Sequence, residues 1–384
     1  MLADEVKRLG LGVSGNGFGK VRFTADKEGL YRSLMALRTA DRVLLEAARF
    51  RATDFEALFE GAKAVRWENL IPPNLGVSVD KVRSGGSALS AQTSIQAVVH
   101  KAAAERLCRA NALSRLPETD DAAKIRVHIE KDEVSLMLDI SGDPLFKRGY
   151  RRKGGTAPLR ETSAAAMLLL SGWKRKYPLC DPFCGSGTVL AEALMYACDA
   201  APGLCRDFAL SRLLIADASL EEKTRSHLRR QISLERKIRI QGSDADPEAA
   251  KLAGSNISAL KDTALAPGNG FENEGGVQVR IEACPMEEAG PAFPKEEGDG
   301  KGEQPAGFIV TNPPYGKRLG DRAGAEKTYA AMAGIAGRFP GWKLAVICDH
   351  QGFESFFRRR ADRVREISGS GGRSYLYEYD RLHR

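Results

Sequence analysis

The sequence predicts an α/β protein in which a mostly parallel, doubly wound sheet follows a separate α+β region. Two observations carry this expectation. After residue 155, short apolar segments typical of strands alternate with helical segments, which is the pattern of βαβ units. Before residue 155, amphipathic helices are mixed with strands that include a local hairpin. The length of 384 residues, 43% of them hydrophobic, suits two or three domains that each bury a core.

In the N-terminal region, periodicity predicts two helices and four strands. The helices begin near Tyr31 and Thr93, and each carries an apolar face. Two segments of alternating apolar and polar residues, joined by a polar turn at 130–133, predict a β-hairpin. The glycine-rich residues 12–19 follow no recognisable strand, so we interpret them as a turn. The expected helices are 31–38 and 93–112, and the expected strands are 43–45, 77–79, 125–129 and 134–140.

The C-terminal region is predicted to contain five strands of a parallel sheet and a closing antiparallel pair. Helices are expected to begin at Ser186 and Pro247. Residues 199–237 are expected to form a helical insertion. Residues 287–306, rich in Glu, Gly, Pro and Lys, are expected to form a mobile surface loop. The expected strands are 179–181, 238–240, 277–281, 307–311 and 344–348, and the closing pair is 365–367 with 374–379.

Composition limits the class of protein. Lys and Arg number 58 against 50 Asp and Glu, and the formal charge of +8 suits a polyanionic partner without identifying one. The seven cysteines are scattered without a CxxC pair, and no histidine lies at metal-ligand spacing, so we expect reduced thiols and no metal. There is no apolar run of about 18 residues and no secretory leader, so a cytoplasmic protein without a membrane partner is expected.

A basic stretch marks the predicted domain boundary near Gly155. Between residues 145 and 176, the basic residues face a single acid, Glu161, which favours contact with phosphates over the alternative of a solvated linker. A second basic run, residues 358–360, is left open between a solvated helix face and a second contact. The basic residues of the stretch are Lys147, Arg148, Arg151, Arg152, Lys153, Arg160, Lys174, Arg175 and Lys176, and the first five are the candidate polyanion contacts.

The sharpest local signal is a segment that follows a strand and opens a helix. Its two glycines, Gly185 and Gly187, let the backbone turn tightly, and the helix N-terminus offers unpaired N–H groups to a ligand. A dinucleotide-binding turn would need a third glycine where Leu190 stands, and a Walker A loop would need Gly-Lys-Ser/Thr. The other alternative is a plain strand-to-helix turn. The candidate binding residues are Asp181, Pro182, Phe183, Cys184, Gly185, Ser186, Gly187 and Thr188.

The next strand ends in the segment Gly242–Asp246. A carboxylate at the end of a second parallel strand can accept both hydroxyls of a ribose, so Asp244, with its neighbour Ala245, is a candidate for that role. Asp246 precedes Pro247, which is the pattern of a helix N-cap with proline at the first position. We predict both roles, with Asp244 binding a ribose and Asp246 capping the helix.

The fourth strand is followed by Asn312-Pro313-Pro314-Tyr315. In isolation such a segment is a turn, but at the carboxyl end of a parallel strand it lines the ligand crevice. The Asn312 side-chain oxygen and the Pro313 carbonyl can both accept hydrogen bonds from one planar exocyclic –NH₂ group. Tyr315 offers a ring on which a base can stack. Asn312, Pro313, Pro314 and Tyr315 are therefore the candidate catalytic residues.

Together these motifs resemble those of class I S-adenosylmethionine-dependent methyltransferases that act on exocyclic amines. The sequence is most similar to the THUMP-domain methyltransferases, in the bacterial branch that makes N2-methylguanine in 23S ribosomal RNA. Members of that branch are often labelled as N6-adenine-specific DNA methylases. The resemblance runs over nearly the whole chain, and its matching segments are 139–151, 157–162, 181–188, 201–204, 242–246 and 311–319.

The resemblance implies three domains. They are a partial ferredoxin-like region of residues 1–50, a THUMP RNA-binding domain of residues 51–155 and a Rossmann-like methyltransferase domain of residues 156–384. It implies that Leu159 and Thr162 join the glycine turn and Asp244 in holding S-adenosylmethionine. The basic stretch would then grip RNA, either 23S rRNA or an assembling large ribosomal subunit.

Two departures from the family pattern stand out. Related proteins begin with another strand ahead of the first helix, so this chain is expected to lack that ferredoxin-like strand. Residues 283–285, Ala-Cys-Pro, stand where many methyltransferases place an Asp that binds the adenine amine, so backbone atoms are expected to take that role. Other readings stay open: methylation of adenine N6 or of guanine N2 in tRNA, a non-catalytic RNA-binding ribosome-assembly factor, and, more distantly, a nicotinamide-dependent oxidoreductase.

Overall fold

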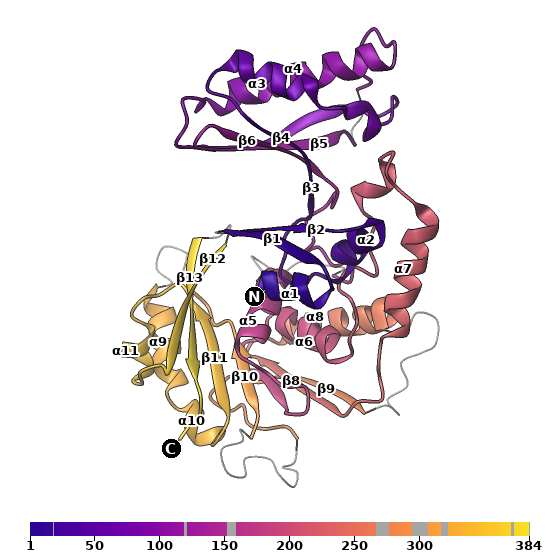
Figure 1. Cartoon of the computed structure of the whole chain (residues 1–384). Helices are drawn as coiled ribbons and strands as arrows, with labels where there is room; N and C mark the ends of the chain where they lie inside the picture. Colours follow the sequence, from indigo (N-terminus) through magenta and orange to yellow (C-terminus); the bar gives the residue numbers. More distant parts are fainter. Residues whose placement is uncertain are drawn as a thin grey trace. The chain divides into compact units, whose positions relative to one another are not determined.

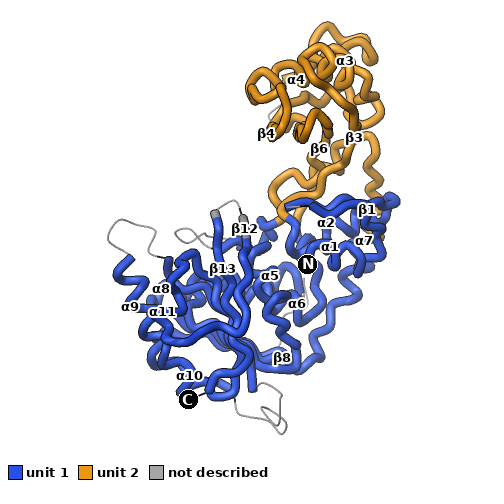
Figure 2. The backbone as a smooth tube through the Cα atoms, turned by 60° about the vertical axis from the view of Figure 1, so that its left-hand side comes forward, with its two compact units in different colours: residues 1–40, 146–205, 224–384 blue, residues 41–145, 206–223 orange. Residues whose placement is uncertain are grey.

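The computed structural model describes residues 1–17, 19–118, 121–151, 159–265, 276–293, 306–315, 322–369 and 372–383. The chain forms two compact units, coloured separately in Figure 2. Unit 1 comprises Met1–Ala40, Phe146–Cys205 and Thr224–Arg384, and unit 2 comprises Asp41–Leu145 and Arg206–Lys223. Every candidate site residue predicted from the sequence belongs to unit 1. Among the described residues, no helix is both long enough and apolar enough to cross a membrane.

Unit 1 is built on a mostly parallel sheet with the strand order β12-β13-β11-β10-β7-β8-β9 (Figure 1). Strand β13 runs antiparallel to both of its neighbours, whereas the pairs from β11 through β10, β7 and β8 to β9 are parallel. The predicted doubly wound sheet with an antiparallel closing strand is confirmed. The strands are β7 (Leu179–Asp181), β8 (Ile238–Asp244), β9 (Val277–Ala283), β10 (Phe308–Thr311), β11 (Lys343–Cys348), β12 (Arg363–Gly369) and β13 (Gly372–Tyr379).

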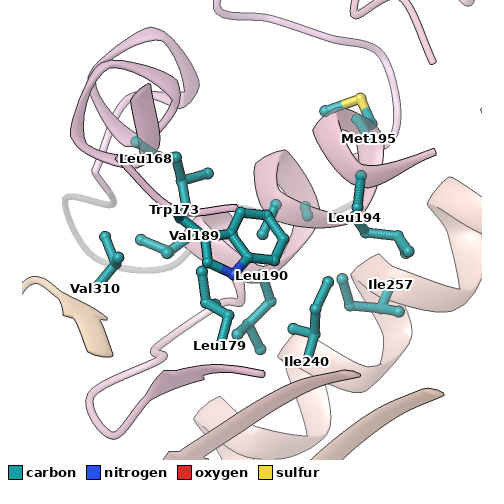
Figure 3. Packing of buried hydrophobic residues seen from close by; sticks show 14 of the residues in the cluster. Leu168, Trp173, Leu179, Val189, Leu190, Leu194, Met195, Ile240, Ile257 and Val310 are labelled. Atoms are coloured by element: carbon teal, nitrogen blue, oxygen red, sulfur yellow. The ribbon is translucent and has the colours of Figure 1, made fainter. Parts of the chain in front are cut away.

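Helices cover both faces of this sheet because its central strands are apolar on both sides. Phe308 and Val310 of β10 lie in one core with α5, α6 and α8, and Ile309 between them lies in a second core with α9, α10 and α11. Figure 3 shows the first core, to which Val310 and Leu179 of the sheet and Leu190 of α6 all belong. The helices are α5 (Glu161–Leu170), α6 (Thr188–Ala197), α8 (Pro247–Leu260) with the π-helical turn η3 (Lys261–Leu265), α9 (Arg322–Met332), α10 (Ile335–Arg338) and α11 (Phe353–Phe357).

The first forty residues also belong to unit 1 and contain α1 (Leu2–Arg8), β1 (Gly12–Gly17), β2 (Lys20–Thr24) and α2 (Lys27–Ala36). The prediction of a turn at 12–19 is wrong for residues 12–17, because β1 pairs antiparallel with β2 around a bulge between Val13 and Gly15. Gly12, Gly15 and Gly17 take three of the six positions of β1 and remove the apolar alternation that identifies a strand. Helix α2 begins four residues earlier than predicted, since Asp26 accepts a 2.7 Å hydrogen bond from the Gly29 N–H as its N-cap.

Helix α2 explains one of the sequence motifs. The N–H of Gly203, in the segment 201–204, donates a 2.8 Å hydrogen bond to the Met35 carbonyl. A Cβ atom at Gly203 would lie 2.8 Å from the Met35 Cα atom, so no other residue fits without movement of the backbone. The segment is therefore a packing contact within unit 1.

Unit 2 is an α+β unit with a four-stranded sheet of order β3-β6-β5-β4. The predicted hairpin is confirmed as β5 and β6, which pair antiparallel across a turn whose residues Lys131 and Asp132 both have positive φ. Strands β4 and β5 are parallel, joined through α4. The elements are β3 (Leu44–Arg51), α3 (Phe55–Ala64), η1 (Trp67–Asn69), β4 (Val77–Gly85), α4 (Gln92–Ala110), β5 (Ala123–Glu130) and β6 (Glu133–Asp139).

The expected helical insertion at 199–237 is only partly helical. It contains the 3₁₀ turn η2 (Ala209–Arg212) and α7 (Ala218–Arg230). Its residues 206–223 belong to unit 2, where the Arg206 guanidinium donates to the backbone carbonyls of Asp143 (2.6 Å) and Pro144 (2.7 Å). The acceptors of the Arg206 guanidinium are backbone carbonyl oxygens, so no side-chain pattern predicts the path of residues 206–223.

The expected surface loop at 287–306 is anchored at two of its described residues, although Glu287 and Glu288 are exposed. Ala289 and Phe293 are buried, and the Gln241 side chain bonds the backbone of residues 290 and 292 at 2.8 and 2.6 Å. Charged and glycine-rich composition predicted exposure, but these anchoring contacts hold the segment against β8. Residues 294–305 lie outside the described part of the chain.

Candidate active site at the switch point of the sheet

The site lies where the strand order of the sheet reverses, between β7 and β10. From β7 the chain continues to β8 and β9 on one side, and from β10 it continues to β11 on the other. The two strands are parallel neighbours, with Phe308 opposite Leu179 and Ile309 opposite Cys180. Their carboxyl ends therefore meet at one edge of the sheet, where ligands of such folds bind. The Thr311 hydroxyl donates a 2.6 Å hydrogen bond to Asp181 Oδ1 across this edge.

The glycine turn after β7 has the backbone that its sequence requires. Gly185 and Gly187 have φ of +52° and +81°, in the left-handed region that favours glycine. A Cβ atom at Gly187 would lie 3.0 Å from the Ala253 Cβ atom of α8, so the second glycine also permits close helix packing. The Asn256 side-chain amide donates a 2.9 Å bond to the Ser186 carbonyl. Helix α6 begins at Thr188, two residues after the predicted start.

Asp244 ends β8 and contacts this turn. The Gly185 N–H donates to Asp244 Oδ2 (2.9 Å), and the Asp246 N–H donates to Asp244 Oδ1 (3.0 Å). Each carboxylate oxygen has two lone pairs, so both can accept a further hydrogen bond. Asp246 Oδ1 accepts from the Glu248 N–H (2.9 Å) with Pro247 at the first helical position, which confirms the predicted N-cap. Ala245 is exposed.

Asp181 is the buried carboxyl group at the centre of the site. Its Oδ1 atom accepts from the Thr311 hydroxyl and from the Phe183 N–H at 3.2 Å. Burial raises the pKa of Asp181 to about 7, and the two hydrogen bonds oppose that rise without cancelling it. The protonation state of Asp181 therefore changes near neutral pH.

The segment after β10 presents its polar atoms in a fixed arrangement. Asn312 and Tyr315 are half-buried, Pro313 is buried and Pro314 is exposed. The Tyr315 hydroxyl donates a hydrogen bond to Asn312 Oδ1. This bond orients the amide of Asn312, and sequence reasoning had assigned Tyr315 only a stacking role.

The remaining candidate cofactor residues are Leu159 and Thr162, at the start of α5, and three residues of the turn itself. Leu159 precedes α5 and packs against the core that contains α6, and Thr162 is buried in the first turn of α5. Pro182 and Cys184 are buried, and Phe183 packs against the core on the opposite face.

Two of the five candidate polyanion contacts in the basic stretch are paired with other side chains of the protein. Arg148 is buried, and its Nε atom forms a 3.0 Å ion pair with Glu192 of α6, so its guanidinium is not presented to phosphates. Arg151 forms a 3.1 Å ion pair with Glu161 and donates a 2.7 Å bond to the Thr188 hydroxyl. The charge count treated these residues as exposed, but two of the cations pair with carboxylates or hydroxyls of α5 and α6. Lys147 is exposed.

Arg152 and Lys153, the other two candidate contacts, lie outside the described residues, as do residues 316–319 of the motif after Tyr315.

Sequence reasoning missed three residues that shape the site. Thr311 was treated as the last strand residue, Asn256 as part of a helix, and Tyr329 of α9 was not considered. Tyr329 donates a 2.8 Å hydrogen bond to the Pro314 carbonyl. Each of these residues bonds a partner at least 15 positions away, and only Asn256, a polar residue in an apolar helix face, carried a detectable signal.

A doubly wound sheet with a glycine turn, a carboxylate after the second strand and an Asn-Pro-Pro-Tyr segment at its switch point defines a class I methyltransferase domain. Domain families match the chain in the same order. The RlmL ferredoxin-like domain matches residues 1–44, the THUMP domain matches 52–139, and the family described as "RMKL-like, methyltransferase domain" matches 148–264 and 299–374. The chain belongs to the RMKL-like methyltransferase family with an N-terminal THUMP domain.

Relatives along the whole chain agree with this assignment. The chain is 31% identical to "Putative RNA methyltransferase YpsC" of Bacillus subtilis (strain 168), over 99% of this chain and 92% of that protein. It is 31% identical to "Ribosomal RNA large subunit methyltransferase K/L" of Syntrophotalea carbinolica over 99% of this chain and 52% of that protein, so it spans about half of the K/L protein.

A solved structure, "SMU.472, a putative methyltransferase complexed with SAH", shares 30% identity and a TM-score of 0.82, over 98% of this chain and 93% of that one.

Proposed function

We propose that this protein transfers the methyl group of S-adenosylmethionine to an exocyclic amine of an RNA base, and that the product is N2-methylguanine in 23S rRNA. The observation that carries the proposal is the meeting of two motifs at one sheet edge. The Asn312–Tyr315 segment offers two oxygen acceptors, Asn312 Oδ1 and the Pro313 carbonyl. It follows directly after Thr311, and the Thr311 hydroxyl donates a hydrogen bond to Asp181, the first residue of the glycine turn.

The residues of the turn fit the cofactor. Asp244 can accept from both hydroxyls of a ribose, because each of its oxygens keeps a lone pair after bonding the Gly185 and Asp246 N–H groups. The segment Asp181–Thr188, with Leu159 and Thr162, would hold the rest of the cofactor. The Cys284 N–H is already bonded to the Asp244 carbonyl (2.9 Å), so adenine recognition at residues 283–285 would use other backbone atoms. S-adenosylmethionine supplies an electrophilic methyl group when bound.

The Asn312–Tyr315 segment would orient the nucleophile. An exocyclic amine that donates to both Asn312 Oδ1 and the Pro313 carbonyl has its lone pair drawn out of conjugation with the ring. Asn312 Oδ1 has a second lone pair, so its bond from Tyr315 leaves room for that amine. The contribution of these residues is positioning and electrostatics, and the surplus proton leaves after transfer. A paired or stacked guanine would be swung out first, which costs a few kcal/mol.

The assignment to 23S rRNA is supported by the K/L relatives named for the large-subunit RNA and by the THUMP match over residues 52–139. Lys147, which is exposed, remains a proposed RNA contact, and so do Arg152 and Lys153. Arg148 is withdrawn from that set because it is buried against Glu192.

A methyl-transfer assay with the purified chain tests the proposal. The chain would be incubated with S-adenosylmethionine labelled in its methyl group and, separately, with unmodified 23S rRNA, 16S rRNA, tRNA or duplex DNA, and the products hydrolysed to nucleosides. We expect label in N2-methylguanosine from 23S rRNA alone. Label in N6-methyladenosine would replace the guanine assignment, and label in 16S rRNA, tRNA or DNA would replace 23S rRNA as the substrate. No label in any of the four nucleic acids would contradict the proposed function.

A further inference from the structure

Tyr329 is a buried side chain that contacts the Asn312–Tyr315 segment. It lies on α9 with no exposed surface, and its ring meets the rings of Phe353 and His350 edge-on, at centroid distances of 5.3 and 5.9 Å. Its hydroxyl donates a 2.8 Å hydrogen bond to the Pro314 carbonyl. Burial raises the pKa of Tyr329, so the hydroxyl stays a donor throughout the neutral range.

The Pro314 carbonyl needs such a partner because of the sequence around it. Pro313 and Pro314 have no N–H groups, so these two residues cannot donate a backbone hydrogen bond to a neighbouring strand. Their carbonyl oxygens are the only polar groups through which hydrogen bonds can orient them. The Tyr329 hydroxyl is a donor that comes from another element and reaches one of those carbonyls.

The bond has a consequence for Asn312. The carbonyl of Pro314 and the N–H of Tyr315 share one planar peptide group. Fixing that carbonyl fixes the rotation of the peptide and therefore the direction in which Tyr315 leaves it. The Tyr315 hydroxyl in turn donates to Asn312 Oδ1. Two hydroxyl bonds thus connect Tyr329 to the amide oxygen that would accept the base amine.

We propose that Tyr329 is a positioning residue for methyl transfer, acting through the Pro314–Tyr315 peptide on the amide of Asn312. This inference rests on the proposed function, in which Asn312 accepts the amine of the base. Misplacement of a reacting group by about 1 Å lowers rates by roughly a hundredfold, so loss of the Tyr329 hydroxyl should act on turnover and not on cofactor binding.

The test compares Tyr329→Phe with a matched variant, Tyr379→Phe. Tyr379 is also buried, lies in the same core, and donates its hydroxyl to a backbone carbonyl, that of Arg359, at 3.2 Å. Both variants lose one hydroxyl and keep the ring. We expect Tyr329→Phe to lower kcat for 23S rRNA by about ten- to a hundredfold, with the Kd for S-adenosylmethionine within about twofold of wild type, and Tyr379→Phe to keep kcat within about twofold.

Amide hydrogen exchange supplies a readout that needs no activity. Tyr329→Phe should speed exchange in the peptide that contains Tyr315, and Tyr379→Phe should not. Equal kcat values for the two variants, or unchanged exchange at Tyr315 in Tyr329→Phe, would overturn the positioning role. A wild-type chain that methylates no RNA, while exchange at Tyr315 still responds to Tyr329→Phe, would contradict the proposed reaction and leave the structural coupling in place.

Discussion

The Thr311 hydroxyl donates a 2.6 Å hydrogen bond to the buried carboxyl group of Asp181. These residues end β10 and β7, two parallel strands that are neighbours in the sheet and are separated by 130 positions in the chain. The bond therefore ties the start of the Asn-Pro-Pro-Tyr segment to the start of the glycine turn. A substitution of Asp181 should therefore affect both motifs.

Asp181→Asn tests the electrostatics of this bond. The folded-state pKa of Asp181, about 7, lies above the ordinary value of 3.8. The folded chain thus holds a proton that the unfolded chain releases, and stability from this group falls as pH rises from about 4 to about 7. Asn is always neutral and keeps Oδ1 as an acceptor. We expect the free energy of unfolding of Asp181→Asn, minus that of wild type, to grow over this range by up to about 4 kcal/mol, measured by urea titration at successive pH values.

A second variant provides the control for Asp181. Thr311→Val removes a hydrogen bond that lowers the pKa of Asp181. The free energy of unfolding of Thr311→Val should therefore keep falling up to a higher pH than that of the wild-type chain. Parallel stability curves for wild type and Asp181→Asn would show that Asp181 does not titrate in this range.

Asn312→Ala should remove turnover and spare the cofactor. The variant loses one of the two oxygens proposed to accept the amine, and loss of one preorganised partner of a transition state lowers kcat by about a hundred- to a thousandfold. Calorimetry should give a Kd for S-adenosylmethionine within about twofold of wild type. Asn111→Ala, in unit 2, loses an amide bond to the Leu107 carbonyl and should keep full activity. Equal losses of turnover and cofactor affinity in Asn312→Ala would place Asn312 in the cofactor site.

Variants of Asp244 and Asp246 distinguish cofactor binding from helix capping. Asp244→Asn keeps the size of the side chain but removes the charge proposed to bind a ribose, and charged acceptors contribute about 1.5–3 kcal/mol per bond. We expect S-adenosylmethionine to bind about ten- to a hundredfold more weakly. Asp246→Ala should lower stability by about 1 kcal/mol through loss of the α8 N-cap, with unchanged cofactor affinity. The reverse pattern would exchange the two assignments.

Arg148→Met tests the reassignment of the basic stretch. The variant leaves the buried carboxylate of Glu192 without its 3.0 Å partner, and such a loss lowers stability by about 3–5 kcal/mol. Lys147→Ala, at the exposed neighbouring position, should change stability by less than about 0.5 kcal/mol. If Arg148→Met instead folds with wild-type stability and loses RNA affinity, Arg148 contacts phosphate after all.

Local patterns were enough to predict the sheet, the glycine turn and the cap at Asp246, because each depends on residues within a few positions of one another. The left-handed backbone of Gly185 and Gly187 and the proline after Asp246 are signals of this kind. The hairpin of β5 and β6 was also predictable, since a polar turn joins two alternating segments.

The features that sequence reasoning missed depend on distant partners. The charges of Arg148 and Arg151 suggested exposure, and only the packing of α5 and α6 shows that Glu192 and Glu161 neutralise them. Strand β1 was missed because its glycines interrupt the alternation of apolar and polar residues that identifies a strand. Tyr329 could not be linked to Pro314 without knowing that α9 packs near the end of β10. The domain limits and the roles of the site residues remain predictions.

The central claim is that Asn312 presents a guanine amine of 23S rRNA for methylation. The most direct measurement is mass-spectrometric mapping of 23S rRNA from cells that lack the gene, complemented with either the wild-type or the Asn312→Ala gene. We predict that one N2-methylguanine is missing without the gene, returns with the wild-type gene and stays missing with Asn312→Ala at equal protein level. An unchanged 23S rRNA in the deletion strain, or full restoration by Asn312→Ala, would contradict the account.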